Sequence, residues 1–303
     1  MSVKASSSNC RLQERQVKFV DIFRTTPVQT VCPNFFVLAH ANGCAFAPQC
    51  RYCYLKSSFW ALRGQRVYVN FPKMAREIRR WLAKDDLESF VLNTGNLSDS
   101  LSFEPVRPLM GKLIELFRAE AEAKGRPHSL LVVTKGGTRE CVPFFAVNPC
   151  ANVIISFSVN ATDAARDHES GAAPVVDRLA AARRLMRQGW RVRMRIDPMI
   201  LGYDYTWVIG QLRKLRPERV TLGTLRAEAA LPKYTEAGLF DALEKPANPR
   251  GLARYPKAKR LALYRPAVKA LKPICPMGLC EETPDVWDAL GLDKDAKSCN
   301  CGS

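Results

Sequence analysis

Short apolar runs alternate with longer segments of helical periodicity along most of the chain. Six runs have strand length: residues 35–39, 89–93, 129–134, 152–159, 191–196 and 219–223. Four segments between them, residues 72–86, 104–125, 174–189 and 204–216, have helical spacing of apolar residues. Strands that alternate with helices predict an α/β fold with a parallel sheet. An open six-stranded barrel and a doubly wound sheet both fit this order.

Local punctuation supports these helices and divides the chain into three parts. Pro72 suits a first helical turn and Gly125 suits a helix C-cap. We expect an N-terminal extension over residues 1–30 and the α/β part over residues 31–240. Residues 241–303 are Pro-rich and basic and hold four cysteines, so we interpret them as an appended segment.

The net charge of +17 is concentrated in two stretches. Residues 178–195 hold seven Arg and residues 250–272 hold eight Lys or Arg, and neither stretch contains an acid. Such a field attracts polyanions, so we expect an anionic partner such as DNA or RNA; a solvated basic face is the alternative. Arg191, Arg193 and Arg195 alternate along one side of a strand, and we expect them to line the lumen and meet an anionic group.

No apolar run approaches the roughly twenty residues that span a bilayer. The first thirty residues lack the apolar core of a signal peptide. We therefore expect a cytoplasmic protein without a membrane partner, and the sequence does not indicate an oligomeric state.

Eleven cysteines in a reducing compartment indicate metal ligation or catalysis where they cluster. Cys44, Cys50 and Cys53 follow the first predicted strand, at the edge where such folds build their sites. Three thiolates do not complete a structural zinc site, but they can hold a 4Fe–4S cluster with one iron open. Tyr52 and Tyr54 bracket the last thiol. We expect a catalytic role in which they pack on the cluster or pass a hydrogen atom; ordinary packing is the alternative.

A second group of thiols lies in the appended segment: Cys275, Cys280, Cys299 and Cys301. Four thiols can hold a second Fe–S cluster or a zinc ion. The alternative is that they bind no metal, because terminal residues are commonly loose.

The motifs "GCAFAPQCRYCYLKS", "VLNTGNLSDSL", "LVVTKGG" and "SFSVN", followed by residues 175–200, occur in one order over residues 30–225. In this order they resemble the radical S-adenosylmethionine (SAM) enzymes, and more specifically the spore photoproduct lyase family. The resemblance implies a partial (β/α)6 barrel, a 4Fe–4S cluster, SAM, and a reducing partner such as flavodoxin or ferredoxin. The cluster would cleave SAM to a 5′-deoxyadenosyl radical that abstracts hydrogen from the substrate.

The resemblance also implies roles for individual residues. Cys44, Cys50 and Cys53 would ligate the cluster, and Lys135 would pair with the SAM carboxylate. The remaining cofactor-binding residues would come from the second loop and from the fourth and fifth strands: Asn93, Gly95, Ser98, Asp99, Ser158, Asn160 and Asp197.

Two features of this sequence differ from the family pattern. Five residues instead of three separate Cys44 from Cys50. Asn96 stands where the lyase carries a hydrogen-donating cysteine, and Cys141 is the candidate replacement.

From the motifs and the basic charge together, we predict a radical SAM enzyme acting on nucleic acid or a nucleotide. The same chemistry on a peptide or metabolite, and a Cys-rich nucleic-acid-binding module, are the alternatives.

Overall fold

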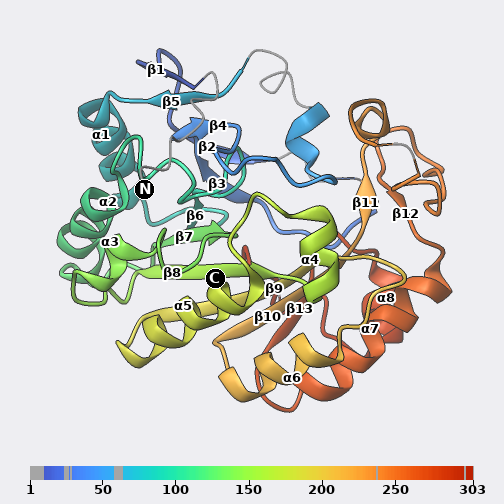
Figure 1. Cartoon of the computed structure of the whole chain (residues 1–303). Helices are drawn as coiled ribbons and strands as arrows, with labels where there is room; N and C mark the ends of the chain where they lie inside the picture. The colour runs from blue at the N-terminus through green and yellow to red at the C-terminus, as the bar shows by residue number, and fades with distance from the viewer. Residues whose placement is uncertain are drawn as a thin grey trace, which may run out of the picture.

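The computed structural model describes residues 10–23, 27, 29–57, 64–236, 238–296 and 298–302. Its main sheet contains all six predicted strands, which run parallel to one another (Figure 1). They are β3 Phe35–Leu38, β6 Val91–Asn93, β7 Ser129–Thr134, β8 Val153–Val159, β9 Arg191–Met199 and β10 Arg219–Thr224. β13 Met277–Leu279 extends the parallel part beyond β10, and β2 Val20–Phe23 pairs antiparallel with β3 at the other edge.

The strand order distinguishes the two architectures that the sequence allowed. The parallel strands follow one another in chain order across the sheet, without the reversal that defines a doubly wound fold. The fold is therefore a partial TIM-like barrel. Its two edge strands, β2 and β13, are not paired with each other among the described residues.

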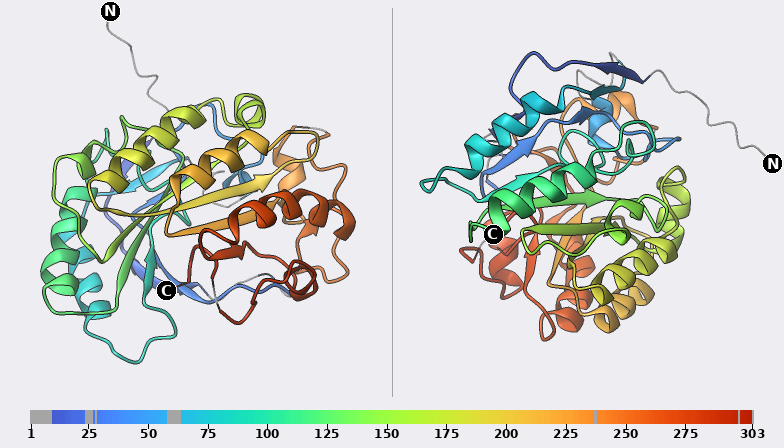
Figure 2. Two further views of the ribbon diagram at one scale, coloured as in Figure 1. Left: turned by 90° about the horizontal axis from the view of Figure 1, so that it is seen from below. Right: turned by 90° about the vertical axis from the view of Figure 1, so that its left-hand side faces the viewer.

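Helices cover the outside of this curved sheet (Figures 1 and 2). They are α1 Phe71–Leu82, α2 Met110–Phe117, α3 Val142–Phe145, α4 Thr162–His168, α5 Val175–Arg187, α6 Thr206–Leu215, α7 Lys257–Leu271 and α8 Pro284–Ala289. A π-helical turn, Arg118–Glu122, continues α2. Pro72 lies in the first turn of α1, as predicted, and Gly125 has a φ of 60° just beyond the π-helical turn, where its lack of a Cβ suits this conformation.

Burial explains why these segments adopt these elements. All seven residues of β8 are buried, as expected for a parallel strand covered on both sides. α1 buries Met74, Ile78 and Trp81, which recur at three- and four-residue spacing on one face. Each such side chain contributes roughly 1.5–3 kcal/mol when it leaves water.

The expected appended segment is not separate from the barrel. β13 hydrogen-bonds to β10, and α7 contributes Leu261 and Tyr264 to the main core. The last described residues enter the barrel from the side where the strands begin. Arg193 Nη1 donates to the carbonyls of Asn300 (2.7 Å) and Gly302 (2.8 Å), so buried arginines hold the tail in place.

Two small sheets border the main one and were not predicted. β1 Arg11–Gln13 and β4 Ala41–Asn42 flank β5 Arg66–Tyr68, whereas β11 Arg226–Ala227 pairs with β12 Ala253–Arg254. These strands are too short to show a period in the sequence. The described helices include none long and apolar enough to cross a membrane.

Candidate active site

The cysteine triplet lies on the loop between β4 and a 3-10 turn, Tyr54–Ser57. Backbone bonds shape this loop: Cys53 N donates to Cys50 O (3.1 Å), and Gly43 N donates to Leu97 O (2.9 Å) in the next loop. All three thiols are free and partly buried. The loop is therefore held at the carboxyl-terminal side of the sheet, where the sequence placed it.

The donor set fits a 4Fe–4S cluster better than a single ion. No three Cys, His, Asp or Glu side chains within the described ranges converge tightly enough to hold one metal ion. In a cubane each cysteine binds a different iron, so the thiolates need not meet at one point. Burial raises the pKa of Cys50 to about 12, and the nearby Lys135 opposes that shift. Metal binding would therefore release protons from these thiols.

The second loop, after β6, is built to hold its own shape. Asn93 Oδ1 accepts from Gly95 N (2.7 Å), and a Cβ on Gly95 would lie 2.5 Å from Val133 Cβ. Asp99 accepts from Thr134 Oγ1 (2.9 Å) and from the backbone N of Lys135 (2.7 Å). Asp99 thus joins the second loop to the third loop, and these bonds use its carboxylate.

Ser98 has a buried partner that the sequence did not indicate. Its Oγ lies 3.0 Å from Nε2 of His40, whose Nδ1 lies 3.2 Å from Arg107 Nη2. Burial, aided by Arg107, lowers the pKa of His40 to about 3, so this imidazole is neutral. A histidine directly after a strand is a signal that could have been read.

Lys135, Ser158 and Asp197 come together as expected, from the ends of β7, β8 and β9. Lys135 Nζ donates to Ser158 Oγ (2.6 Å), and Ser158 Oγ donates to the backbone O of Asp197 (3.2 Å). Lys135 keeps some exposure on the lumen side, with 16% of its side chain accessible. These three residues form one connected set at the strand ends.

A buried carboxylate, Glu169, completes this side of the lumen and was missed. It accepts from Tyr52 Oη, from Asn160 Nδ2 (3.0 Å) and from Arg178 Nη1 (2.5 Å), and it lies 3.4 Å from Lys135 Nζ. Burial alone would raise the pKa of Glu169, but Lys135 and Arg178 lower it to about 2. The sequence feature that could have indicated Glu169 is its place in the connection between β8 and α5, at the end where the strands finish.

Next to Ser158, on the neighbouring strand β9, Asp197 is the centre of an ion-pair network. Its carboxylate pairs with Arg195 and with Arg226 Nη1 (2.7 Å). Both guanidinium groups also donate to Cys280 Sγ, at 3.3 Å from Arg195 and 3.1 Å from Arg226. Cys280 follows β13 and is partly exposed, so a thiol faces the same space as the predicted cofactor residues.

The four predicted catalytic residues occupy different environments. Tyr52 is buried and donates to Glu169. Tyr54 is half exposed and donates to the backbone O of Asn96. Cys141 is fully buried in the main core beside α3. This burial does not support the expectation that Cys141 replaces the missing donor, and that role stays a prediction.

The structure does not bring the four tail cysteines together. Cys275 is buried in the main core, and Cys280 lies at the lumen. Cys299 and Cys301 lie in the tail, where Cys301 Sγ is 3.9 Å from Asn93 Nδ2 and packs near Val91 and Leu131. A second cluster on these four thiols stays a prediction, and this arrangement does not support it.

The two basic stretches match their predicted role only in part. Arg193 is buried, as expected, but it and Arg191 pair with the chain's own Glu218 and not with a free anion. Arg260 of α7 is also buried and pairs with Glu282. These arginines satisfy internal carboxylates because an unpaired guanidinium is costly to bury.

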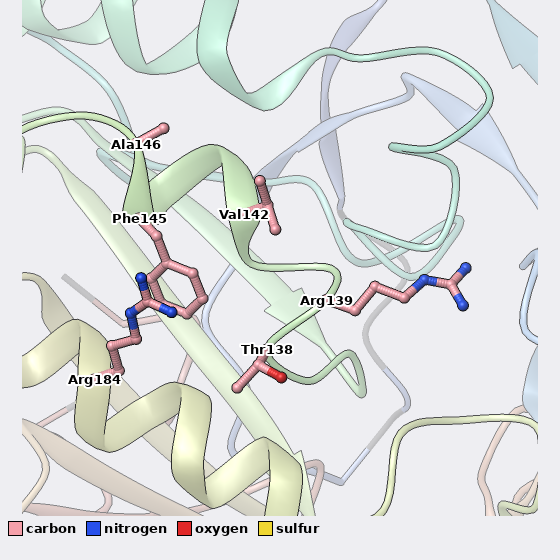
Figure 3. Close-up of a pocket in the computed structure, with 6 residues that line it drawn as sticks. All are labelled: Thr138, Arg139, Val142, Phe145, Ala146 and Arg184. Carbon is pink, nitrogen blue, oxygen red and sulfur yellow. The ribbon is translucent and has the colours of Figure 1, made fainter.

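A surface cavity of about 500 Å³ lies away from the cysteine loop. It is lined by Thr138, Arg139, Val142, Phe145, Ala146 and Arg184 (Figure 3). The Arg184 guanidinium stacks on the Phe145 ring, with 3.8 Å between its central carbon and the ring centroid, whereas Arg139 points away. This cavity sits between α3 and α5 and contains none of the predicted site residues.

Comparison with solved structures supports the fold. A spore photoproduct lyase variant with one cysteine replaced by alanine superposes with a TM-score of 0.72 at 17% identity, covering 89% of this chain and 81% of the other. Spore photoproduct lyase complexed with dinucleoside spore photoproduct gives a TM-score of 0.71 at 17% identity, with the same coverage. A variant with bound AdoMet and dinucleoside spore photoproduct gives 0.68 at 17%, covering 90% and 82%.

No curated protein matches the sequence significantly. The family model described as spore photoproduct lyase matches residues 13–234, which is more than half of the chain. This match includes the cysteine triplet and the loops after β6, β7, β8 and β9. The chain therefore belongs to the spore photoproduct lyase family, and it is a radical SAM enzyme.

Proposed function

We propose that Cys44, Cys50 and Cys53 hold a 4Fe–4S cluster and that the enzyme repairs or modifies a pyrimidine base in nucleic acid. With SAM bound, such a cluster supplies a 5′-deoxyadenosyl radical that removes a hydrogen atom from the substrate. Lys135 Nζ lies 5.7 Å from the ring centroid of Tyr52 on the cysteine loop and contacts Ser158, which contacts Asp197. This convergence at one end of the parallel strands carries the proposal.

Charge supports a carboxylate ligand at Lys135. Lys135 and Arg178 share one carboxylate, Glu169, so this group of three keeps one positive charge. Arg178 is almost fully buried, whereas the Lys135 ammonium reaches the lumen. SAM carries a carboxylate that would neutralise the excess, and the surrounding hydroxyl and amide groups suit its polar remainder. The adenosine contact of Asp197 stays a prediction, because two arginines already hold its carboxylate.

We infer that Cys280, whose sulfur accepts from Arg195 and Arg226, is the hydrogen donor in place of the family cysteine that Asn96 replaces here. A substrate radical would take hydrogen from the Cys280 S–H bond, forming a C–H bond and leaving a thiyl radical. One electron from a flavodoxin- or ferredoxin-type reductant and one proton from water would restore the thiol. Burial raises the pKa of Cys280, although both arginines oppose that shift, and a protonated thiol is the form that can donate.

Nucleic acid is the substrate class that the charge favours, and the neighbouring lyases bind a dinucleoside lesion. α7 begins on the side where the strands end and exposes Lys259 there, together with Lys257, which pairs with Asp285. A Lys257→Ala, Lys259→Ala double variant should reduce the salt slope of duplex DNA binding by about 0.9 for each lost phosphate contact. Lys214→Ala is the control: it removes an exposed lysine in the last turn of α6, on the side where the strands begin, and should leave the salt slope unchanged.

The central test is anaerobic reconstitution with iron and sulfide, reduction, and detection of 5′-deoxyadenosine from SAM. Wild-type protein should be brown and should cleave SAM. Colourless protein that carries zinc would favour a nucleic-acid-binding module. Cleavage without DNA binding at low salt would favour a peptide or metabolite substrate.

A further inference from the structure

Glu169 connects the cysteine loop to the interior of the barrel. Tyr52, whose phenol donates to Glu169, lies between two of the three cysteines that we assign to the cluster. The Glu169 side chain has no accessible surface. Its other partners are Lys135 and Asn160, which directly follow β7 and β8, and Arg178 of α5. One carboxylate therefore touches both the cluster loop and the lysine proposed to bind SAM.

Two neighbouring contacts show that this connection belongs to a larger seam. Arg51 N donates to His168 O (2.9 Å), and Arg51 Nη1 donates to Asp167 O (3.3 Å). A Cβ on Gly171 would lie only 2.1 Å from Pro48 O, so the segment after α4 lies directly against the cysteine loop. Residues 167–171 thus form a wall for that loop.

We propose that Glu169 is a positioning residue that fixes the cysteine loop and lowers the reduction potential of the cluster it holds. This inference rests on the proposed cluster. Reduction adds negative charge to a cluster, and a buried carboxylate nearby opposes that addition because few solvent dipoles screen it. Lys135 and Arg178 offset part of this effect, which leaves the potential sensitive to the Glu169 charge.

Two substitutions separate the charge of Glu169 from its hydrogen bond. Glu169→Gln removes the charge and keeps an oxygen that can accept from Tyr52. Tyr52→Phe keeps the charge and removes the donor. Glu120→Gln, which alters a surface carboxylate paired with Arg79 and Lys124, is the control for a change in net charge.

The measurement is potentiometric titration of the reconstituted cluster by electron paramagnetic resonance, with chelator-induced cluster loss followed in parallel. Glu169→Gln should shift the midpoint potential to more positive values, and Glu120→Gln should leave it unchanged. Tyr52→Phe should keep a potential close to that of the wild type but lose its cluster several-fold faster. Glu169→Asp, which keeps the charge on a shorter side chain, should also stay close to the wild-type potential.

The outcomes distinguish this inference from the proposed function. A wild-type protein that assembles no cluster overturns both. A cluster of unchanged potential in Glu169→Gln overturns the electrostatic role, and an unchanged loss rate in Tyr52→Phe overturns the positioning role. If Glu169→Gln does not fold, Glu169→Asp decides the electrostatic role: it keeps the charge, so a clear shift of its midpoint potential from the wild-type value contradicts that role.

Discussion

The two groups of cysteines are placed differently in the fold: one lies on a single loop, and the other is spread over separate elements. Cys44, Cys50 and Cys53 share one loop, which contacts the second loop and the wall after α4. The tail group is dispersed: Cys275 is in the core, Cys280 is at the lumen, and Cys299 and Cys301 are in the inserted tail. Thiols that share one loop can act on one cluster, whereas thiols on separate elements meet only if the topology brings them together.

The contrast also separates two kinds of burial. Cys280 has guanidinium donors on its sulfur and keeps access to the lumen. Cys275 packs among apolar side chains, where a free thiol behaves as a small hydrophobe. Their spacing along the sequence therefore does not indicate which tail thiol is chemically available.

The sharpest test of this comparison replaces the whole triplet by alanine. The Cys44→Ala, Cys50→Ala, Cys53→Ala variant should lose about four irons per chain and all SAM cleavage, because every protein ligand of the cluster is gone. Iron analysis and chromatography of 5′-deoxyadenosine measure both effects. Retained SAM cleavage with the tail cysteines intact would reverse the assignment of the two groups.

The second test concerns the single tail thiol at the lumen. Cys280→Ala should keep SAM cleavage and lower the rate of product formation roughly tenfold or more. A tenfold decrease corresponds to an activation free energy higher by about 1.4 kcal/mol. With dinucleoside spore photoproduct, the ligand of the neighbouring lyases, as a probe of the proposed function, reaction in D₂O should place solvent deuterium in the wild-type product, because the Cys280 thiol exchanges with solvent.

Cys275→Ser, with its thiol in the core, is the control for this variant. Product from Cys280→Ala that carries as much deuterium as the wild-type product would show that another group supplies the hydrogen atom.

The smallest effect is expected for the remaining tail thiols. Cys275→Ser, Cys299→Ser and Cys301→Ser together should leave the iron content unchanged and should lower the stability by about 1–3 kcal/mol for each buried hydroxyl without a partner. Iron analysis and urea unfolding measure these quantities. A loss of iron in this variant would support the predicted second cluster.

The sequence predicted the parts of this molecule that depend on local pattern. Short apolar runs located β3, β6–β8 and β10, alternation of apolar residues with arginines located β9, and the clustered cysteines located the site at the strand ends. β13 was missed because Met277–Leu279 is too short to show a pattern, and only its pairing with β10 makes it a strand.

Residues whose roles depend on distant partners could not be identified in this way. Glu169 resembles an ordinary loop acid until Arg178 and Tyr52 surround it. Arg260 resembles a surface cation until Glu282, 22 residues later, pairs with it inside the protein. Charge along the sequence overestimated the free positive surface for the same reason.

The bond between Tyr52 and Glu169 has a consequence for how the protein is made. The two residues are 117 positions apart, which corresponds to roughly 6–23 s of synthesis at typical translation rates. During that interval the cysteine loop has left the peptidyl-transferase centre, but its wall does not yet exist. Iron loading should therefore follow synthesis of β8 and α5, and ribosome-bound chains arrested before Glu169 should fail to retain a cluster.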